Sequence, residues 1–118
     1  MRDLLLVGAG GFLGATLRYG VSLAFAGSSF PYGTLLVNIV GSLAIGLLAG
    51  WIATGVVQDV HREFFAIGLL GALTTFATFS YETVALVQRG DMGLAGLSVL
   101  LNVVLSIGAA FLGLRLVS

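Results

Sequence analysis

Long apolar stretches dominate this chain, and short polar stretches separate them. A membrane-spanning helix needs about 20 largely apolar residues to cross about 30 Å of hydrocarbon. Because the breaks are too short to form a soluble domain, the pattern predicts an all-α membrane protein, one domain over residues 1–118, with four transmembrane helices. The predicted spans are residues 4–26, 33–56, 64–87 and 94–117.

The composition of the chain also favours a membrane protein. Charged residues make up 8% of the chain, whereas a soluble protein carries about 25%. Five arginines balance five acidic residues, so no basic surface for nucleic acid is expected. The absence of cysteine excludes disulfides and thiolate metal sites. The sequence contains no pairing of nucleophile and base that would indicate an enzyme.

The apolar start of the chain contains a glycine pattern that mimics a nucleotide site. Gly8, Gly11 and Gly14 form G-x-x-G-x-x-G, similar to the turn that binds pyrophosphate in dinucleotide-binding domains. Such a domain also needs an acidic residue about 20 positions further on, and alternating strands and helices. Residues 27–37 contain no Asp or Glu, and long apolar segments follow. The sequence therefore argues against nucleotide binding.

The glycines favour close packing of helices instead. Gly10 and Gly14, and Gly46 and Gly50, are GxxxG pairs. Such pairs let helix backbones approach closely in lipid, where no hydrophobic force drives helices together. The simpler interpretation is that glycine is frequent in membrane helices.

The distribution of arginines bears on which way up the protein inserts. With four spans, Arg2, Arg62 and Arg115 lie on one side, while Arg89 and at most Arg18 lie on the other. This bias is small, and nearby acidic residues offset it. The sequence therefore allows insertion in both orientations and assembly of an antiparallel pair. The alternative is a single orientation set by the modest bias.

Two ionisable residues interrupt the apolar spans, Arg18 and Glu82. Charged groups in hydrocarbon are costly, so they usually line a water-filled cavity or pair with each other. Both residues are therefore candidates for a functional role. The alternative is that each lies near the end of a span and extends its charged group to the lipid headgroups.

Uncharged polar side chains cluster in the second, third and fourth spans. Asn38 lies inside the second span, and Ser98, Asn102 and Ser106 recur every fourth residue of the last, which places them on one stripe of a helix. The alternative is hydrogen bonding between helices, at about 0.6 kcal/mol per bond on average. The third span adds donors of the same kind, Thr74, Thr75, Thr78 and Ser80.

Two phenylalanines lie beside these donors, Phe76 and Phe79. Three residues apart, they share roughly one helical face. Because the edge of an aromatic ring is positive, ring edges next to hydroxyl and amide donors would form a surface for a small anion. The alternative is packing in the protein core.

The stretch "GALTT" at residues 71–75 is a poor helix interior. It joins a glycine to consecutive threonines, whose hydroxyls compete for backbone groups. A break at bilayer depth exposes carbonyls, which is tolerated only in a cavity or inside protein. Freed carbonyls commonly coordinate a cation, so a break here indicates a site for a monovalent metal ion.

Four stretches, in this order, resemble the Fluc (CrcB) fluoride channel family over the whole chain. They are "GGFLGATLRY" at 10–19, "GTLLVNIVGS" at 33–42, "GALTTFATFSYE" at 71–82 and "NVVLS" at 102–106. The resemblance implies an antiparallel, dual-topology homodimer with a broken third helix and two pores, each built from both subunits. It also implies a structural Na⁺ at the dimer centre.

The resemblance assigns roles to individual residues. The carbonyls of Gly71 and Thr74 would bind Na⁺, Phe76 and Phe79 would form aromatic boxes along the pore, and Asn38 would donate to fluoride. The polar track would involve Thr75, Thr78, Ser80, Asn102 and Ser106, with Arg18 and Glu82 near the aqueous vestibules. The chain departs from the common family pattern "GGFTTFSTFS" at Ala72 and Ala77, and the second change removes a hydroxyl.

The implied function is passive export of fluoride across the inner (plasma) membrane, which would protect the cell from fluoride toxicity. One rival is a small dual-topology multidrug transporter, which would need a glutamate in its first helix where this chain has Arg18. The second rival is a non-transporting membrane assembly subunit, in which the polar stripes only hold helices together.

Overall fold

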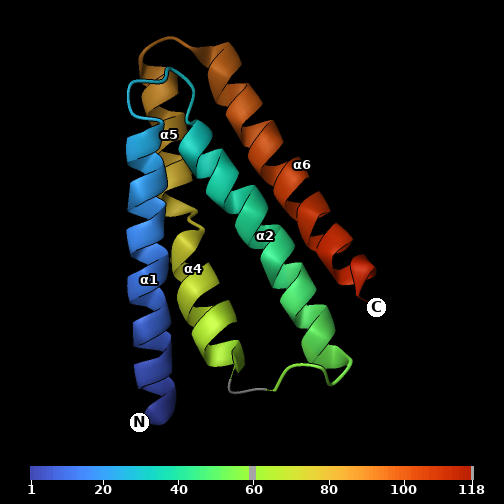
Figure 1. Cartoon of the computed structure of the whole chain (residues 1–118). Coiled ribbons are helices and arrows are strands. Elements are labelled where there is room, and N and C mark those ends of the chain that lie inside the picture. Colours follow the sequence, from blue (N-terminus) through green and yellow to red (C-terminus); the bar gives the residue numbers. More distant parts are fainter. Residues whose placement is uncertain (59–60, 118) are drawn as a thin grey trace.

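The protein is a bundle of helices that run along one another in alternating directions (Figure 1). The computed structural model describes residues 1–58 and 61–117. The N-terminus lies at the same end as the turn after the second helix, and the last helix descends towards that end (Figure 1). The elements are α1 (Arg2–Ala24), α2 (Tyr32–Ala53), the π-helix η1 (Arg62–Leu70), α4 (Gly71–Leu73), α5 (Ala77–Gln88) and α6 (Met92–Leu116).

Four helical segments are long and apolar enough to cross a membrane, which confirms the predicted number of spans. They are Arg2–Ala24, Tyr32–Ala53, Arg62–Gln88 and Met92–Leu116. Three of them begin two residues before the predicted start, and Tyr32–Ala53 begins one residue before it. Apolar patterning marks the part of a helix that lies in hydrocarbon, whereas the helix itself extends into the headgroup layer.

The second span ends at Ala53 rather than at residue 56, and the backbone explains why. Gly55 has a φ of +81°, a left-handed conformation that glycine adopts without strain. Its N–H donates to the Ile52 carbonyl at 3.1 Å, and the N–H of Val56 donates to the Trp51 carbonyl at 2.9 Å. These bonds close the helix with a Schellman motif.

Glycines bring the helices together in two pairs. α1 packs on η1 and α4, and α2 packs on α6 (Figure 1). A Cβ added to Gly10 would collide with the Phe64 carbonyl, and one added to Gly46 would collide with the Ala110 carbonyl. Both predicted GxxxG motifs thus lie at helix contacts within the chain.

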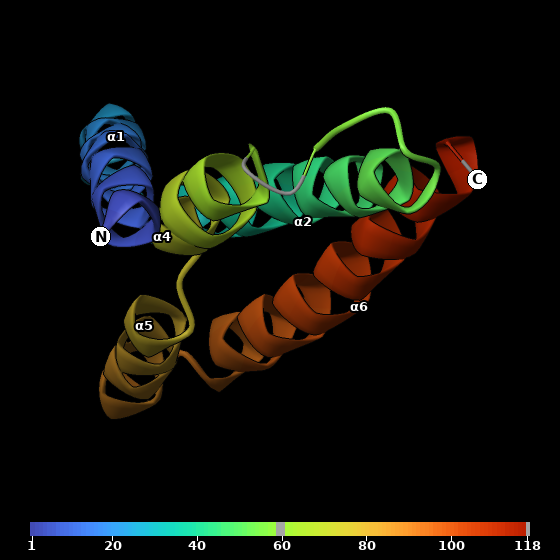
Figure 2. The ribbon, with the colours of Figure 1, turned by 90° about the horizontal axis from the view of Figure 1, so that it is seen from below.

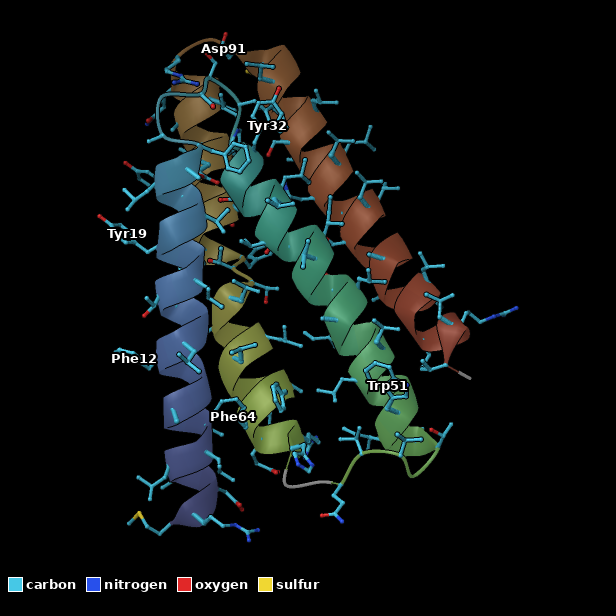
Figure 3. All side chains as sticks on the ribbon, in the orientation of Figure 1. Phe12, Tyr19, Tyr32, Trp51, Phe64 and Asp91 are labelled. Atoms are coloured by element: carbon cyan, nitrogen blue, oxygen red, sulfur yellow. The ribbon has the colours of Figure 1, made fainter. Side chains whose placement is uncertain are left out.

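Residues 74–76 connect α4 to α5 without helical structure, and α5 lies apart from the row formed by α1, α4 and α2 (Figure 2). Thr74 is extended, with φ −81° and ψ 154°. The outer surface of the bundle is strongly apolar, and Phe12 and Tyr19 project from the free face of α1 (Figure 3). Such a surface suits lipid or another membrane helix.

Candidate ion-binding site

The centre of the molecule holds a hydrogen-bonded group of two asparagines and the non-helical segment. The N–H of Thr75 donates to Asn38 Oδ1 at 2.9 Å. Asn38 Nδ2 donates back to the Thr75 carbonyl at 3.3 Å and across to Asn102 Oδ1 at 2.9 Å. Three separate parts of the chain therefore meet here: α2, the 74–76 segment and α6.

Asn102 continues this group along α6. Its Nδ2 donates to the Ser98 carbonyl at 2.9 Å and approaches the Ser98 hydroxyl at 3.4 Å. Asn102 is 5% exposed and Ser98 is fully buried. Because buried amides are costly unless they are hydrogen-bonded, these contacts explain how polar groups are accommodated in an apolar bundle.

A cavity of about 330 Å³ lies beside the two asparagines. Seven of the residues predicted for the pore or the cation site line it: Asn38, Thr74, Thr75, Phe76, Phe79, Asn102 and Ser106. Ser42, Val103 and Ile107 also line it. Ser42 was not predicted, although it follows Asn38 by one helical turn, and that spacing was the signal available in the sequence.

The two phenylalanines of the cavity meet edge to face. Their ring centroids are 5.5 Å apart and their planes are inclined at 62°. Phe79 is 8% exposed, whereas Phe76 is 77% exposed. One ring is thus anchored in the bundle, and the other forms the open side of the cavity.

The cavity offers donors without charge. The Ser106 hydroxyl is buried and has no hydrogen-bond partner within residues 1–58 and 61–117. The Thr75 hydroxyl accepts from the N–H of Thr78 at 3.2 Å, and its own proton is not used in that bond. Hydroxyl protons and positive ring edges can therefore face a small anion with no arginine, lysine or histidine in the lining.

Two predicted residues lie close to this cavity but do not line it. The backbone N–H of Thr78 donates to the hydroxyl of Thr75, which does line the cavity. Ser80 lies two residues further along α5 and is half-buried.

The proposed cation ligands lie at the start of the non-helical segment. Gly71 is exposed, and the hydroxyl of Thr74 donates to the Leu70 carbonyl at 3.0 Å. Within the part of the chain that the structure describes, no hydrogen bond reaches the carbonyl of Gly71 or of Thr74. Arg18 lies beside them, and its Nε donates to the Ala72 carbonyl at 3.1 Å.

Glu82 belongs to a second cavity, of about 270 Å³, at the end of the bundle where α2 begins and α5 ends. Figure 3 labels Tyr32 and Asp91 at this end. Thr34 and Arg89 also line this cavity. One Glu82 oxygen, Oε1, is buried without a partner among the described residues. The structure therefore places Arg18 and Glu82 in separate surroundings.

Comparisons with known proteins agree with this geometry. The model of the CrcB-like protein family, described as Camphor Resistance (CrcB), matches residues 5–114. Three curated relatives carry the name fluoride-specific ion channel FluC. The protein of Vibrio campbellii is 49% identical over 93% of this chain and 90% of its own length. That of Shewanella oneidensis is 48% identical over 99% and 97%, and that of Aliivibrio salmonicida is 46% identical over 98% of each.

These relatives are ion channels by name rather than enzymes. Together with four candidate spans, they identify a multi-pass membrane protein. The family model matches residues 5–114, and the alignment with the Aliivibrio salmonicida protein covers 98% of both proteins. The chain therefore belongs to the CrcB-like family.

Proposed function

We propose that this protein is a fluoride-specific ion channel that lets fluoride leave the cell through the inner (plasma) membrane and so protects against fluoride toxicity. The observation that carries the proposal is the central cavity, in which hydroxyl donors and two phenylalanine rings stand together without any charged side chain. The names of the relatives support the same ion.

The chemistry of the cavity suits passage of an anion. Removing an isolated ion from water costs on the order of tens of kcal/mol on an idealised estimate. The donors of the cavity must therefore replace the hydration shell of the ion. A fixed positive charge would hold the ion too tightly, whereas several weak sites allow it to move on. An inside-negative membrane potential favours anion exit by about 2.3 kcal/mol per 100 mV, so export needs no other energy source.

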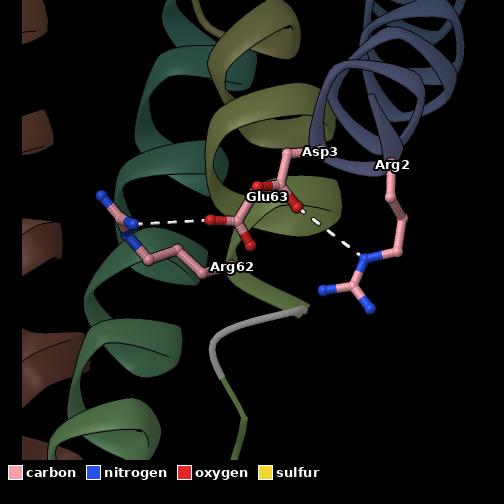
Figure 4. A network of polar contacts seen from close by, with 4 residues as sticks. All are labelled: Arg2, Asp3, Arg62 and Glu63. Carbon is pink, nitrogen blue, oxygen red and sulfur yellow. Dashed lines mark ion pairs between the residues drawn. The ribbon is translucent and has the colours of Figure 1, made fainter.

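A second copy of the chain, in antiparallel orientation, completes the pore in this proposal. One chain leaves Phe76 mostly exposed, so a single copy does not enclose the ion. Insertion in both orientations is supported by the small arginine bias, because charges at both ends are paired locally. At one end Arg2 lies 3.9 Å from Asp3 and Arg62 lies 3.6 Å from Glu63 (Figure 4).

The other end of the bundle is balanced in the same way, since Arg89 lies 3.7 Å from Asp91. Arg18 and Glu82 would then stand in the vestibules that lead to the pore. In that position Glu82 would meet hydrated ions, and Arg18 would hold the end of α4 through the Ala72 carbonyl.

The carbonyls of Gly71 and Thr74, which accept no hydrogen bond from the described residues, would suit a structural Na⁺. Two copies related by a two-fold axis would supply two such pairs of oxygens, and backbone carbonyls are hard ligands suited to a hard cation. The ion would neutralise these dipoles at the dimer centre and hold the interrupted third helices together.

The experiment that tests the function is anion efflux from proteoliposomes under a K⁺ gradient with valinomycin, followed with fluoride and chloride electrodes. Fast loss of fluoride with chloride retained is the expected result. If both anions stay inside vesicles that contain folded dimer, the protein is not a channel, and the polar residues serve only assembly.

A further inference from the structure

The two asparagines form a chain of amides whose direction is fixed at both ends. At one end, the Ser98 carbonyl can only accept a hydrogen bond, so the NH₂ group of Asn102 must face it. Asn102 then presents its oxygen to Asn38. At the other end, the Thr75 N–H can only donate, so it must meet the oxygen of Asn38.

Reversing either amide would place donor against donor and acceptor against acceptor. A flipped Asn38 would set its NH₂ group against the Thr75 N–H and its oxygen against the oxygen of Asn102. All three hydrogen bonds of Asn38 would become repulsive contacts, because its oxygen would also face the Thr75 carbonyl, next to an Asn102 that is 5% exposed. The orientation of Asn38 is therefore set jointly by the backbone of Thr75 and by the residue at 102, which lies on a different helix.

The same bonds occupy the donors of Asn38. Its two N–H protons point to the Thr75 carbonyl and to Asn102 Oδ1, so neither is free to serve an ion in the cavity. Asn38 instead holds the backbone of Thr75 on both its N–H and its carbonyl. The donors left facing the cavity are hydroxyls, and the buried one of Ser106 has no partner among the described residues.

We propose that Asn102 is a positioning residue: together with the Thr75 backbone, its side-chain oxygen fixes the orientation of the Asn38 amide, which in turn holds Thr75 in place beside the cavity. The inference deepens the proposed function and rests on it for its effect on ion flow. The geometry of the amide chain can be tested without any transport.

The chain offers a direct probe, because Asn38 and Asn102 are its two asparagines. Labelling with ¹⁵N-asparagine therefore gives two side-chain NH₂ groups in an NMR spectrum of the protein in nanodiscs. We expect both groups to exchange their protons with water at least about tenfold more slowly than free asparagine does. Exchange of the Asn38 group at the rate of free asparagine would overturn the proposal.

Two variants at one position separate the oxygen from the bulk of the side chain. Asn102→Leu removes the acceptor, and the Asn38 NH₂ group is expected to lose at least about tenfold of its protection. Asn102→Asp keeps an oxygen in the same place and, as a neutral carboxyl, can still donate its O–H to the Ser98 carbonyl, so protection is expected to stay within about threefold of the wild type. Equal protection of Asn38 in the Leu and Asp variants contradicts a role for the oxygen.

Gln88→Glu is the matched control, because it makes the same change from amide to carboxylate at an exposed helix end. Elution volume and helical circular dichroism show that each variant is folded. In proteoliposomes Asn102→Leu should lower fluoride efflux by about tenfold or more, and more than Asn102→Asp does. If wild-type vesicles pass no fluoride, the channel function fails, while the NMR comparison still decides the positioning role.

Discussion

The two cavities of this protein differ in the kind of polar group that they hold. The central one is lined by hydroxyls, amides and phenylalanine rings, without a charged side chain. The one at the end of the bundle contains both Glu82 and Arg89. Charged side chains thus line the cavity at the end of the bundle, and neutral donors lie where an ion has to shed its water.

This difference indicates that the groups that attract ions to the protein can be separate from the groups that select among them. A charge near the entrance changes the local concentration of ions, and its effect weakens with added salt. Neutral donors deep in the protein act on the ion that has entered, and salt screens them little. Substitutions in the two cavities should therefore differ in size and in salt dependence.

The largest effect is expected for Asn38→Asp. A carboxylate cannot donate to the Thr75 carbonyl or to Asn102, and it places a negative charge beside the path of an anion. Fluoride efflux should fall by at least about 100-fold, because several buried groups lose their partners together. The efflux assay measures this, with Gln88→Glu as the control for the same chemical change. Efflux within about threefold of the wild type would show that Asn38 is not part of the ion-binding site.

The two phenylalanines should separate ion flow from stability. Replacing either with isoleucine removes a ring edge, so we expect fluoride efflux to fall by about tenfold or more in both variants. Only Phe79→Ile should also lower the melting temperature, because Phe79 is 8% exposed and Phe76 is 77% exposed. Thermal unfolding in detergent checks the second part. Wild-type efflux from both variants would mean that the rings only pack.

Ser106→Ala tests the buried hydroxyl that has no partner among the described residues. Its removal should cost little stability, since no hydrogen bond within the described chain is lost, yet fluoride efflux should fall by about three- to tenfold. Thr16→Val is the matched control, because it deletes a hydroxyl that donates to the Phe12 carbonyl on an exposed face of α1. Equal efflux from the two variants would argue against Ser106.

The smallest effect is expected at the end cavity. Glu82→Gln removes a charge but keeps the shape, so fluoride efflux should change by less than about fivefold at low salt. The difference from wild type should shrink as ionic strength rises towards 0.5 M, where screening shortens the reach of a charge to about 4 Å. Efflux at several salt concentrations measures both. A large loss that salt does not alter would place Glu82 in the neutral path instead.

Much of the fold follows from the sequence because lipid imposes a simple rule. A helix is the one local structure that satisfies its own backbone in hydrocarbon, so long apolar runs predict helices directly. Their ends are less predictable. The second span stops at Ala53 because of the Schellman motif at Gly55, and this depends on backbone bonds that hydropathy does not register.

The residues of the central site could be gathered from the sequence, but their contacts could not. Spacing along one helix places Asn102 and Ser106 on one stripe, and it could also have added Ser42. That Asn38 bonds to Thr75 and Asn102 depends on how α2, α6 and the 74–76 segment pack in space. Such contacts join residues up to 64 positions apart, where periodicity carries no information.

The glycine contacts have a consequence for the order in which the protein is made. α1 packs on the third span and α2 on the fourth, so neither closely packed pair consists of consecutive spans. While the ribosome is still adding α6, the glycine face of α2 has only lipid to touch. Insertion of the spans and their packing are thus separate events in time. This bundle can close only after its last helix has entered the membrane.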